Sequence, residues 1–188
     1  MTVGLYGGAF DPPHRGHVEL ARRAKEVFGI PRLLVLVAAA PGHKRVTTSP
    51  ELRLELARAA FPDDEVVLDE HARTIDLLRD HPEWQDAVFL IGADEFCDFP
   101  EWKEPDEVLA RVRLGVATRP GFPEGRLQAV LDRLRSPERV LFFGIEPTPV
   151  ASRELRAAFV EGDVPPGVAE IIRRERLYDA APGYTGPA

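Results

Sequence analysis

The chain has 188 residues, enough for one domain with a real hydrophobic core. It carries 24 Lys and Arg against 31 Asp and Glu, a formal charge of −7, which argues against a general binding surface for nucleic acid. The single cysteine, Cys97, excludes an intramolecular disulfide framework and suits a reducing compartment. The N-terminus does not resemble a signal peptide, and no apolar run approaches the ~20 residues of a membrane span. We therefore expect a cytoplasmic protein that binds neither nucleic acid nor membranes.

Apolar runs of strand length recur along the chain. Their near-continuous Val, Leu, Ile and Phe content is typical of parallel strands that are covered on both faces. These runs cover residues 2–6, 32–39, 65–68, 87–91, 114–117 and 139–143.

Helical patterns lie between most of these runs. The first helix is predicted to begin after Pro13 and end at Gly29, and the second has Ser49 as its N-cap and Pro50 at its first position. Further helices are expected over residues 74–80, 105–110, 125–135, 152–159 and 166–174. This alternation predicts an α/β fold, a doubly wound Rossmann-like parallel sheet with C-terminal helices. We predict a single domain over residues 1–179 and a flexible tail over residues 180–188.

The densest chemical signal is the turn GGAFDPPHRGH at residues 7–17. It follows a strand and opens a helix, where unpaired backbone N–H groups favour an anion. Gly7 and Gly8 allow the backbone to approach a phosphate, and His14 and His17 are spaced to point at one ligand. The turn contains neither common phosphate motif and lacks the spacing of a helical zinc site. Two solvated histidines on a tight turn are the alternative, but the glycines and Asp11 favour phosphate.

This turn resembles the GxFDPxHxGH signature of a family of nucleotidyltransferases, the bacterial nicotinate (nicotinamide) mononucleotide adenylyltransferases. His14 and His17 match its HxGH pair. Further blocks are similar to the family's PPHK, IGxD, FxxW, RRPG and ISSTxxR elements, in that order, and the resemblance covers about residues 2–177. The matching blocks are PGHK at 41–44, LIGAD at 90–94, FPEW at 99–102, ATRPG at 117–121 and VASRELR at 150–156.

The resemblance implies that ATP transfers its adenylyl group to nicotinate mononucleotide, giving deamido-NAD and pyrophosphate, in NAD biosynthesis. It implies catalytic roles for His14, His17 and Lys44. The residues that would contact ATP are Gly7, Gly8, Ala9, Phe10, Gly92, Asp94, Arg119, Ser152, Arg153 and Arg156. Those that would contact the pyridine mononucleotide are Thr74, Trp102 and Lys103. Mg²⁺ would arrive on the ATP phosphates, because no cluster of carboxylates resembles an all-protein metal site.

Elementary chemistry supports these implied roles. Asp94 follows a strand end and can accept hydrogen bonds from ribose hydroxyls, although a solvated acidic residue is the alternative. Trp102 can stack on a pyridinium ring, with a cation–π contribution of ~0.5 to 2 kcal/mol. The attacking phosphate is already ionised at neutral pH, so positioning and charge neutralisation replace a general base.

Two segments depart from the family pattern. At 151–153, Ala151 and Arg153 stand where the family has hydroxyl residues, so a helix N-cap at Ser152 with a solvated Arg153 is an equal alternative to phosphate contact. At 70–76 the loop is shorter than usual, and Arg73 can rebuild part of the acceptor pocket. Nicotinamide mononucleotide, phosphopantetheine as acceptor, and an inactive nucleotide-sensing module therefore stay open as alternatives.

Overall fold

A computed structural model describes residues 2–42, 45–148 and 150–178. Its strands form one parallel sheet in the order β3-β2-β1-β4-β5-β6. The strands are β1 (Val3–Gly8), β2 (Arg32–Ala38), β3 (Glu65–Asp69), β4 (Val88–Gly92), β5 (Arg113–Thr118) and β6 (Val140–Gly144). Each overlaps one of the predicted apolar runs, so the doubly wound α/β fold is confirmed.

Helices connect the strands. They are α1 (Arg15–Phe28), α2 (Pro50–Ala60), α3 (Thr74–Asp80), α4 (Ala93–Asp98), α5 (Pro105–Arg111), α6 (Glu124–Leu131), α7 (Ser152–Ala157) and α8 (Pro166–Glu175). Short 3₁₀ helices lie between these elements. They are η1 (Pro82–Trp84), η2 (Phe99–Glu101), η3 (Pro137–Arg139) and η4 (Glu161–Asp163). Helix α4 has no counterpart among the helices predicted from the sequence. Helices α6 and α7 end earlier than predicted, at Leu131 and at Ala157, and the backbone is extended at Ala158.

Local sequence explains where the first two helices begin and end. Gly29 takes up a left-handed conformation with φ of 59° just after α1, which glycine adopts without steric cost. Ser49 accepts a hydrogen bond from the backbone N–H of Leu52 and so caps α2, as predicted.

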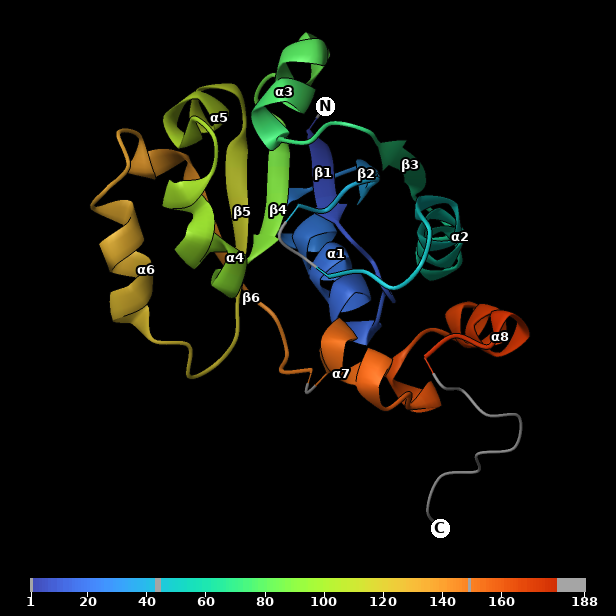
Figure 1. Cartoon of the computed structure of the whole chain (residues 1–188). Coiled ribbons are helices and arrows are strands. Elements are labelled where there is room, and N and C mark those ends of the chain that lie inside the picture. Colours follow the sequence, from blue (N-terminus) through green and yellow to red (C-terminus); the bar gives the residue numbers. More distant parts are fainter. Residues whose placement is uncertain (1, 43–44, 149, 179–188) are drawn as a thin grey trace.

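Side chains of the sheet pack on both of its faces. On β1, Leu5 belongs to the core beneath α3 to α6, whereas its neighbour Tyr6 belongs to the core beneath α1, α2 and α8. Figure 1 shows α4, α5 and α6 to the left of the strands and α2 and α8 to the right. In the described part of the chain, no helix combines the length and the apolar character needed to cross a membrane.

The strand order reverses direction between β1 and β4. From β1 the chain moves outward to β2 and β3, and it then returns to β4 on the other side of β1 and continues outward to β6. Ligands of open α/β sheets bind at the carboxyl ends of the strands at such a reversal. The turn after β1 and the residues after β4 both lie there.

Candidate active site

A cavity of about 880 Å³ opens at the carboxyl ends of the strands. Every described residue that the sequence analysis proposed for the site lines it. They are Gly7, Gly8, Ala9, Phe10, His14, His17, Thr74, Gly92, Asp94, Trp102, Lys103, Arg119, Ser152, Arg153 and Arg156. Lys44 lies outside the described residues. Residues from six separate parts of the sequence are thus brought to one surface.

Two hydrogen bonds between side chains and backbone N–H groups fix His14 and His17 at the start of α1. His14 is the N-cap, and its Nδ1 accepts a hydrogen bond of 3.2 Å from the backbone N–H of Gly16. In return, the Nδ1 of His17 accepts a bond of 3.1 Å from the backbone N–H of His14. The two ring centroids are 3.8 Å apart. A Cβ at position 16 would lie 3.1 Å from the His14 ring, so only glycine fits there without displacing the ring.

These bonds fix the tautomer of both rings. Since each Nδ1 accepts, a neutral ring carries its proton on Nε2, which is then a hydrogen-bond donor. His14 is 9% exposed, and burial together with the positive charge of Arg119 lowers its pKa to about 4. His14 is therefore neutral at physiological pH and suited to donate a hydrogen bond from Nε2.

Asp11 is buried within the turn and fastens it to distant segments. One carboxylate oxygen accepts from the backbone N–H and hydroxyl of Thr47 at 2.6 and 3.2 Å. The other accepts from the hydroxyls of Thr48 and Tyr178 at 2.8 and 2.5 Å. The position of the turn is therefore set by the loop before α2 and by the segment after α8.

Arg53 is a fully buried residue that the sequence analysis did not identify. Its guanidinium donates to the carbonyls of Ala9 at 3.0 Å, Ala38 at 2.6 Å and Ala39 at 2.9 Å, and its Nε donates to Thr48. Burial lowers its pKa, which the negative charge of Asp11 opposes. Arg53 thus joins the backbone that follows β1 to the backbone that follows β2.

Phe10 lines the cavity but is only 2% exposed. Its ring packs edge-on against Tyr6, Phe61 and His17, at centroid distances of 5.5, 5.8 and 5.3 Å. A Cβ at Gly8 would lie 2.9 Å from this ring. Gly8 is therefore required for the packing of Phe10. The sequence had indicated a different role for this glycine, the close approach of a phosphate.

Asp94 and Arg119 both line the cavity and form an ion pair with each other. An Arg119 terminal nitrogen lies 3.3 Å from Oδ2 of Asp94, and both side chains are largely exposed. Gly92 precedes Asp94, and a Cβ at this position would meet no protein atom within 4 Å. The absence of that Cβ leaves room on the cavity side of β4.

The start of α7 lies against the turn after β1. The Ser152 hydroxyl donates to the carbonyl of Pro12 at 2.9 Å, and a terminal nitrogen of Arg156 donates to the carbonyl of Asp11 at 2.6 Å. The N-cap is Ala151, so the alternative of an N-cap serine at Ser152 is wrong. Arg153 is exposed at the cavity rim.

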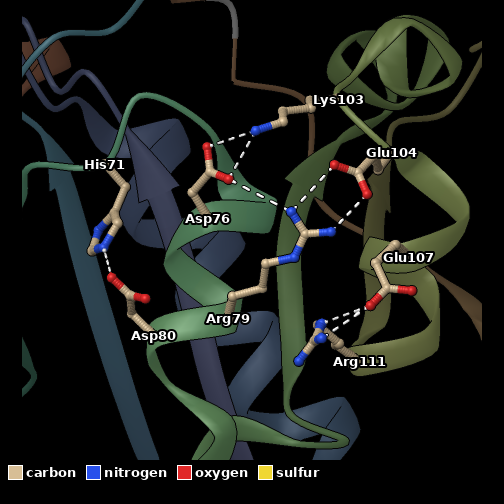
Figure 2. A network of polar contacts seen from close by, with 8 residues as sticks. All are labelled: His71, Asp76, Arg79, Asp80, Lys103, Glu104, Glu107 and Arg111. Carbon is tan, nitrogen blue, oxygen red and sulfur yellow. Dashed lines mark hydrogen bonds and ion pairs between the residues drawn. The ribbon is translucent and has the colours of Figure 1, made fainter.

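Trp102 and Lys103 also line the cavity, on the side where α3 begins. The Trp102 ring is half-buried and packs edge-on against Phe99 and Phe89, at centroid distances of 5.2 and 6.2 Å. Figure 2 shows Lys103 pointing to Asp76 of α3, with the ammonium 2.9 Å from Oδ1. Arg79 joins the same carboxylate at 3.8 Å and pairs with Glu104 at 2.6 Å. These ion pairs connect α3, which begins at Thr74, to the segment that carries Trp102.

Trp84, the other tryptophan of the chain, is buried in the core. Among the described residues, no group of three or more His, Cys, Asp or Glu side chains is arranged to hold a metal ion.

The fold is a doubly wound parallel α/β sheet, and its cavity lies at the reversal of strand order. Residues 5–158 match the model of the cytidylyltransferase-like family. A probable nicotinate-nucleotide adenylyltransferase of Rubrobacter xylanophilus is 32% identical over 96% of this chain and 93% of its own length. One from Thermus thermophilus is 34% identical over 95% of this chain and 100% of its own. The chain belongs to the cytidylyltransferase-like family and, within it, to the nicotinate-nucleotide adenylyltransferases.

A solved structure supports the fold. Nicotinic acid mononucleotide adenylyltransferase of Plasmodium falciparum, complexed with NaAD, superimposes with a TM-score of 0.72 and 18% identity. The similarity covers 95% of this chain and 97% of that protein.

Proposed function

We propose that this protein transfers the adenylyl group of ATP to nicotinate mononucleotide, forming deamido-NAD and pyrophosphate. One observation carries the proposal: a single cavity is lined both by the paired histidines at the start of α1 and by the ring of Trp102. The first feature suits a phosphate undergoing transfer, and the second suits a flat aromatic ring. The relatives named for this reaction support the same conclusion.

In the proposed reaction, a phosphate oxygen of the mononucleotide attacks the α-phosphorus of ATP. A new P–O bond forms there, the bond to the bridging oxygen of the β-phosphate breaks, and pyrophosphate leaves with those electrons. The attacking oxygen is already ionised, so the protein needs donors and not a base. The Nε2–H groups of His14 and His17 would stabilise the charge that develops on the α-phosphate.

The remaining phosphates of ATP would lie toward α7. Arg156 uses a terminal nitrogen to bond Asp11, and a guanidinium has five N–H donors, so others can bind phosphate. Ser152 and Arg153 lie beside it on the cavity rim, and Lys44 is proposed from the sequence to act with them. Mg²⁺ would enter bound to the ATP phosphates and offset part of their charge.

The nicotinate ring would stack on Trp102. Stacking recognises the face of a ring and not its substituent, so the choice of acid over amide has to come from donors at the ring edge. Thr74, at the start of α3, and backbone N–H groups near Trp102 are candidates. Asp76 already binds Lys103, so this lysine offers less net charge to the substrate than the sequence alone suggests.

The deciding experiment measures pyrophosphate release from ATP with each candidate acceptor. We expect nicotinate mononucleotide to give a higher kcat/KM than nicotinamide mononucleotide, and phosphopantetheine to give none. A preference for the amide would contradict the acceptor assignment. Release with neither pyridine nucleotide would contradict the proposed function itself.

A further inference from the structure

The segment of residues 70–73, between β3 and α3, forms one wall of the cavity. His71, Ala72 and Arg73 line it together with Thr74, on the side where Trp102 and Lys103 also lie. This is the segment that is shorter than in the family pattern. A short loop still has to be held in place if Thr74 is to reach a bound ring.

His71 makes contacts with residues on either side of this segment, at the end of β3 and at the end of α3. Its Nδ1 lies 2.8 Å from Oδ1 of Asp69, the last residue of β3, and its backbone N–H donates to the same oxygen at 2.9 Å. Its Nε2 lies 3.0 Å from Oδ2 of Asp80, the last residue of α3. Figure 2 shows the His71 ring turned toward Asp80, along the side of the helix. The imidazole therefore connects the strand before the segment to the far end of the helix after it.

Both contacts depend on the charged ring. An ionised carboxylate only accepts hydrogen bonds, so both ring nitrogens have to carry a proton for both bonds to form. The hydrogen bonds that the ring donates to Asp80 and Asp69 raise the pKa of His71 above its ordinary value, and burial opposes them.

Other ionisable groups also face this ring. Asp76 lies on α3 and has its own pKa lowered, mainly by Lys103 and to a smaller extent by His71. The His81 ring is 6.3 Å away and is itself bonded to Glu83 at 2.9 Å. Carboxylates thus dominate the surroundings of His71 on β3 and α3 alike, which favours the imidazolium.

We propose that His71 is a positioning residue for the mononucleotide, holding the segment 70–73 against the cavity in place of a longer loop. The inference rests on the proposed function and adds a residue that acts on its acceptor side. The effect is local, because α3 itself is held independently by the pairs that Asp76 makes with Lys103 and Arg79 makes with Glu104. Loss of His71 therefore releases the segment before α3 and leaves the helix in place.

The test compares His71→Gln and Asp80→Asn with the control His81→Gln. A glutamine amide can donate to one of the two carboxylates but cannot span both, and the Asp80 side chain is 71% exposed, so its replacement spares the fold. We expect His71→Gln to raise the KM for nicotinate mononucleotide about tenfold, the scale of one charged hydrogen bond, and Asp80→Asn to raise it about two- to fivefold, the scale of an exposed ion pair. The kcat and the KM for ATP should stay unchanged. The control should behave as wild type, because His81 does not line the cavity.

A pH profile distinguishes positioning from a merely structural role. The folded pKa of His71 is raised, so the double contact is complete below it and is lost as the pH rises through it. The wild-type KM for the mononucleotide should therefore rise as the pH is raised through the folded pKa of His71, whereas the KM of His71→Gln should not, and the two should converge. The substrate phosphate titrates near pH ~6, below the ordinary pKa of histidine of ~6.5 and so below the raised pKa of His71.

Unchanged KM values in both variants, or one shared pH profile, would overturn the role of His71. Wild-type protein that releases no pyrophosphate with any pyridine mononucleotide would instead overturn the proposed function. Because wild type is measured first, a failure of the proposed function can be distinguished from a failure of the role of His71.

Discussion

The hydroxyl of Tyr178 donates a 2.5 Å hydrogen bond to Oδ1 of Asp11, a residue 167 positions earlier in the chain. Burial and the negative charge of Asp11 raise the pKa of Tyr178, so the phenol stays protonated and remains a donor. The backbone carbonyl of Asp11 meanwhile accepts from Arg156. The C-terminal part of the chain therefore holds the same turn that carries His14.

Tyr178→Phe removes this bond while keeping the ring. We expect the free energy of unfolding to fall by about 1.5 to 3 kcal/mol, the usual contribution of a hydrogen bond to a charged group. Turnover should fall as well, because the turn after β1 loses one of its supports. Denaturant unfolding and kcat measured on the same preparation check both effects. Wild-type stability in the variant would show that the contact is absent in solution.

His17→Ala should lower kcat by roughly 10² to 10³, the usual effect of losing one preorganised donor to a transition state. The thermal melting temperature should fall as well, because the variant loses the hydrogen bond that His17 accepts from the His14 backbone and the ring contact with Phe10. Near-normal turnover in a folded variant would exclude His17 from catalysis.

His14 is the N-cap of α1 in addition to its proposed role as a hydrogen-bond donor to phosphate. Variants of His14 can therefore separate its effect on stability from its effect on catalysis. His14→Ala loses the cap, at a cost of ~0.5 to 2 kcal/mol, together with the donor. His14→Asn keeps a capping oxygen and should be more stable than the alanine variant, yet equally slow. Equal stability of the two variants would argue against the capping role.

The buried His14 also predicts how stability depends on pH. Its pKa is about 4 in the folded protein, whereas an unfolded histidine titrates near pH ~6.5. Between these values the unfolded chain binds more protons, so acidification destabilises the fold. From pH ~7 to ~5 the loss from this residue should be about 2 kcal/mol. Unfolding of wild type and His14→Asn at both pH values isolates it, because the other titrating groups are shared.

Asp94→Asn should raise the KM for ATP by about tenfold, the lower end for a hydrogen bond to a charged group, because this side chain is exposed. The increase should be smaller for the deoxy analogue of ATP that lacks the contacted hydroxyl. Stability should hardly change, since an exposed ion pair such as that with Arg119 contributes ~0 to 1 kcal/mol. Equal increases for ATP and both deoxy analogues would argue against a ribose contact.

Much of the fold was predictable because its signals are local. Strands buried on both faces leave near-continuous apolar runs, and Ser49, Pro50 and Gly29 mark helix ends by their own backbone chemistry. The turn after β1 was conspicuous because its glycines, aspartate and histidines are contiguous. Helix α4 left no such pattern, since only Ala93 and Phe96 of its six residues are buried.

The supports of the site were less visible because they depend on contacts between distant residues. Nothing near Asp11 in the sequence indicates that Thr47 and Tyr178 bind its carboxylate. Arg53 was not identified from the sequence. One signal was available, because Arg53 shares a helix face with the buried Leu56, Ala57 and Ala60.

All the bonds of the Arg53 guanidinium described above end on backbone carbonyls. A carbonyl is present whichever amino acid occupies the position, so these bonds place little demand on the side chains of Ala9, Ala38 and Ala39. Those positions can therefore diverge in related proteins while the paths of the two loops are retained. A mutational scan should accordingly find Arg53 intolerant of replacement, including by lysine, whose single ammonium cannot reproduce the fork of donors. Small polar substitutions at the three alanines should be tolerated far better.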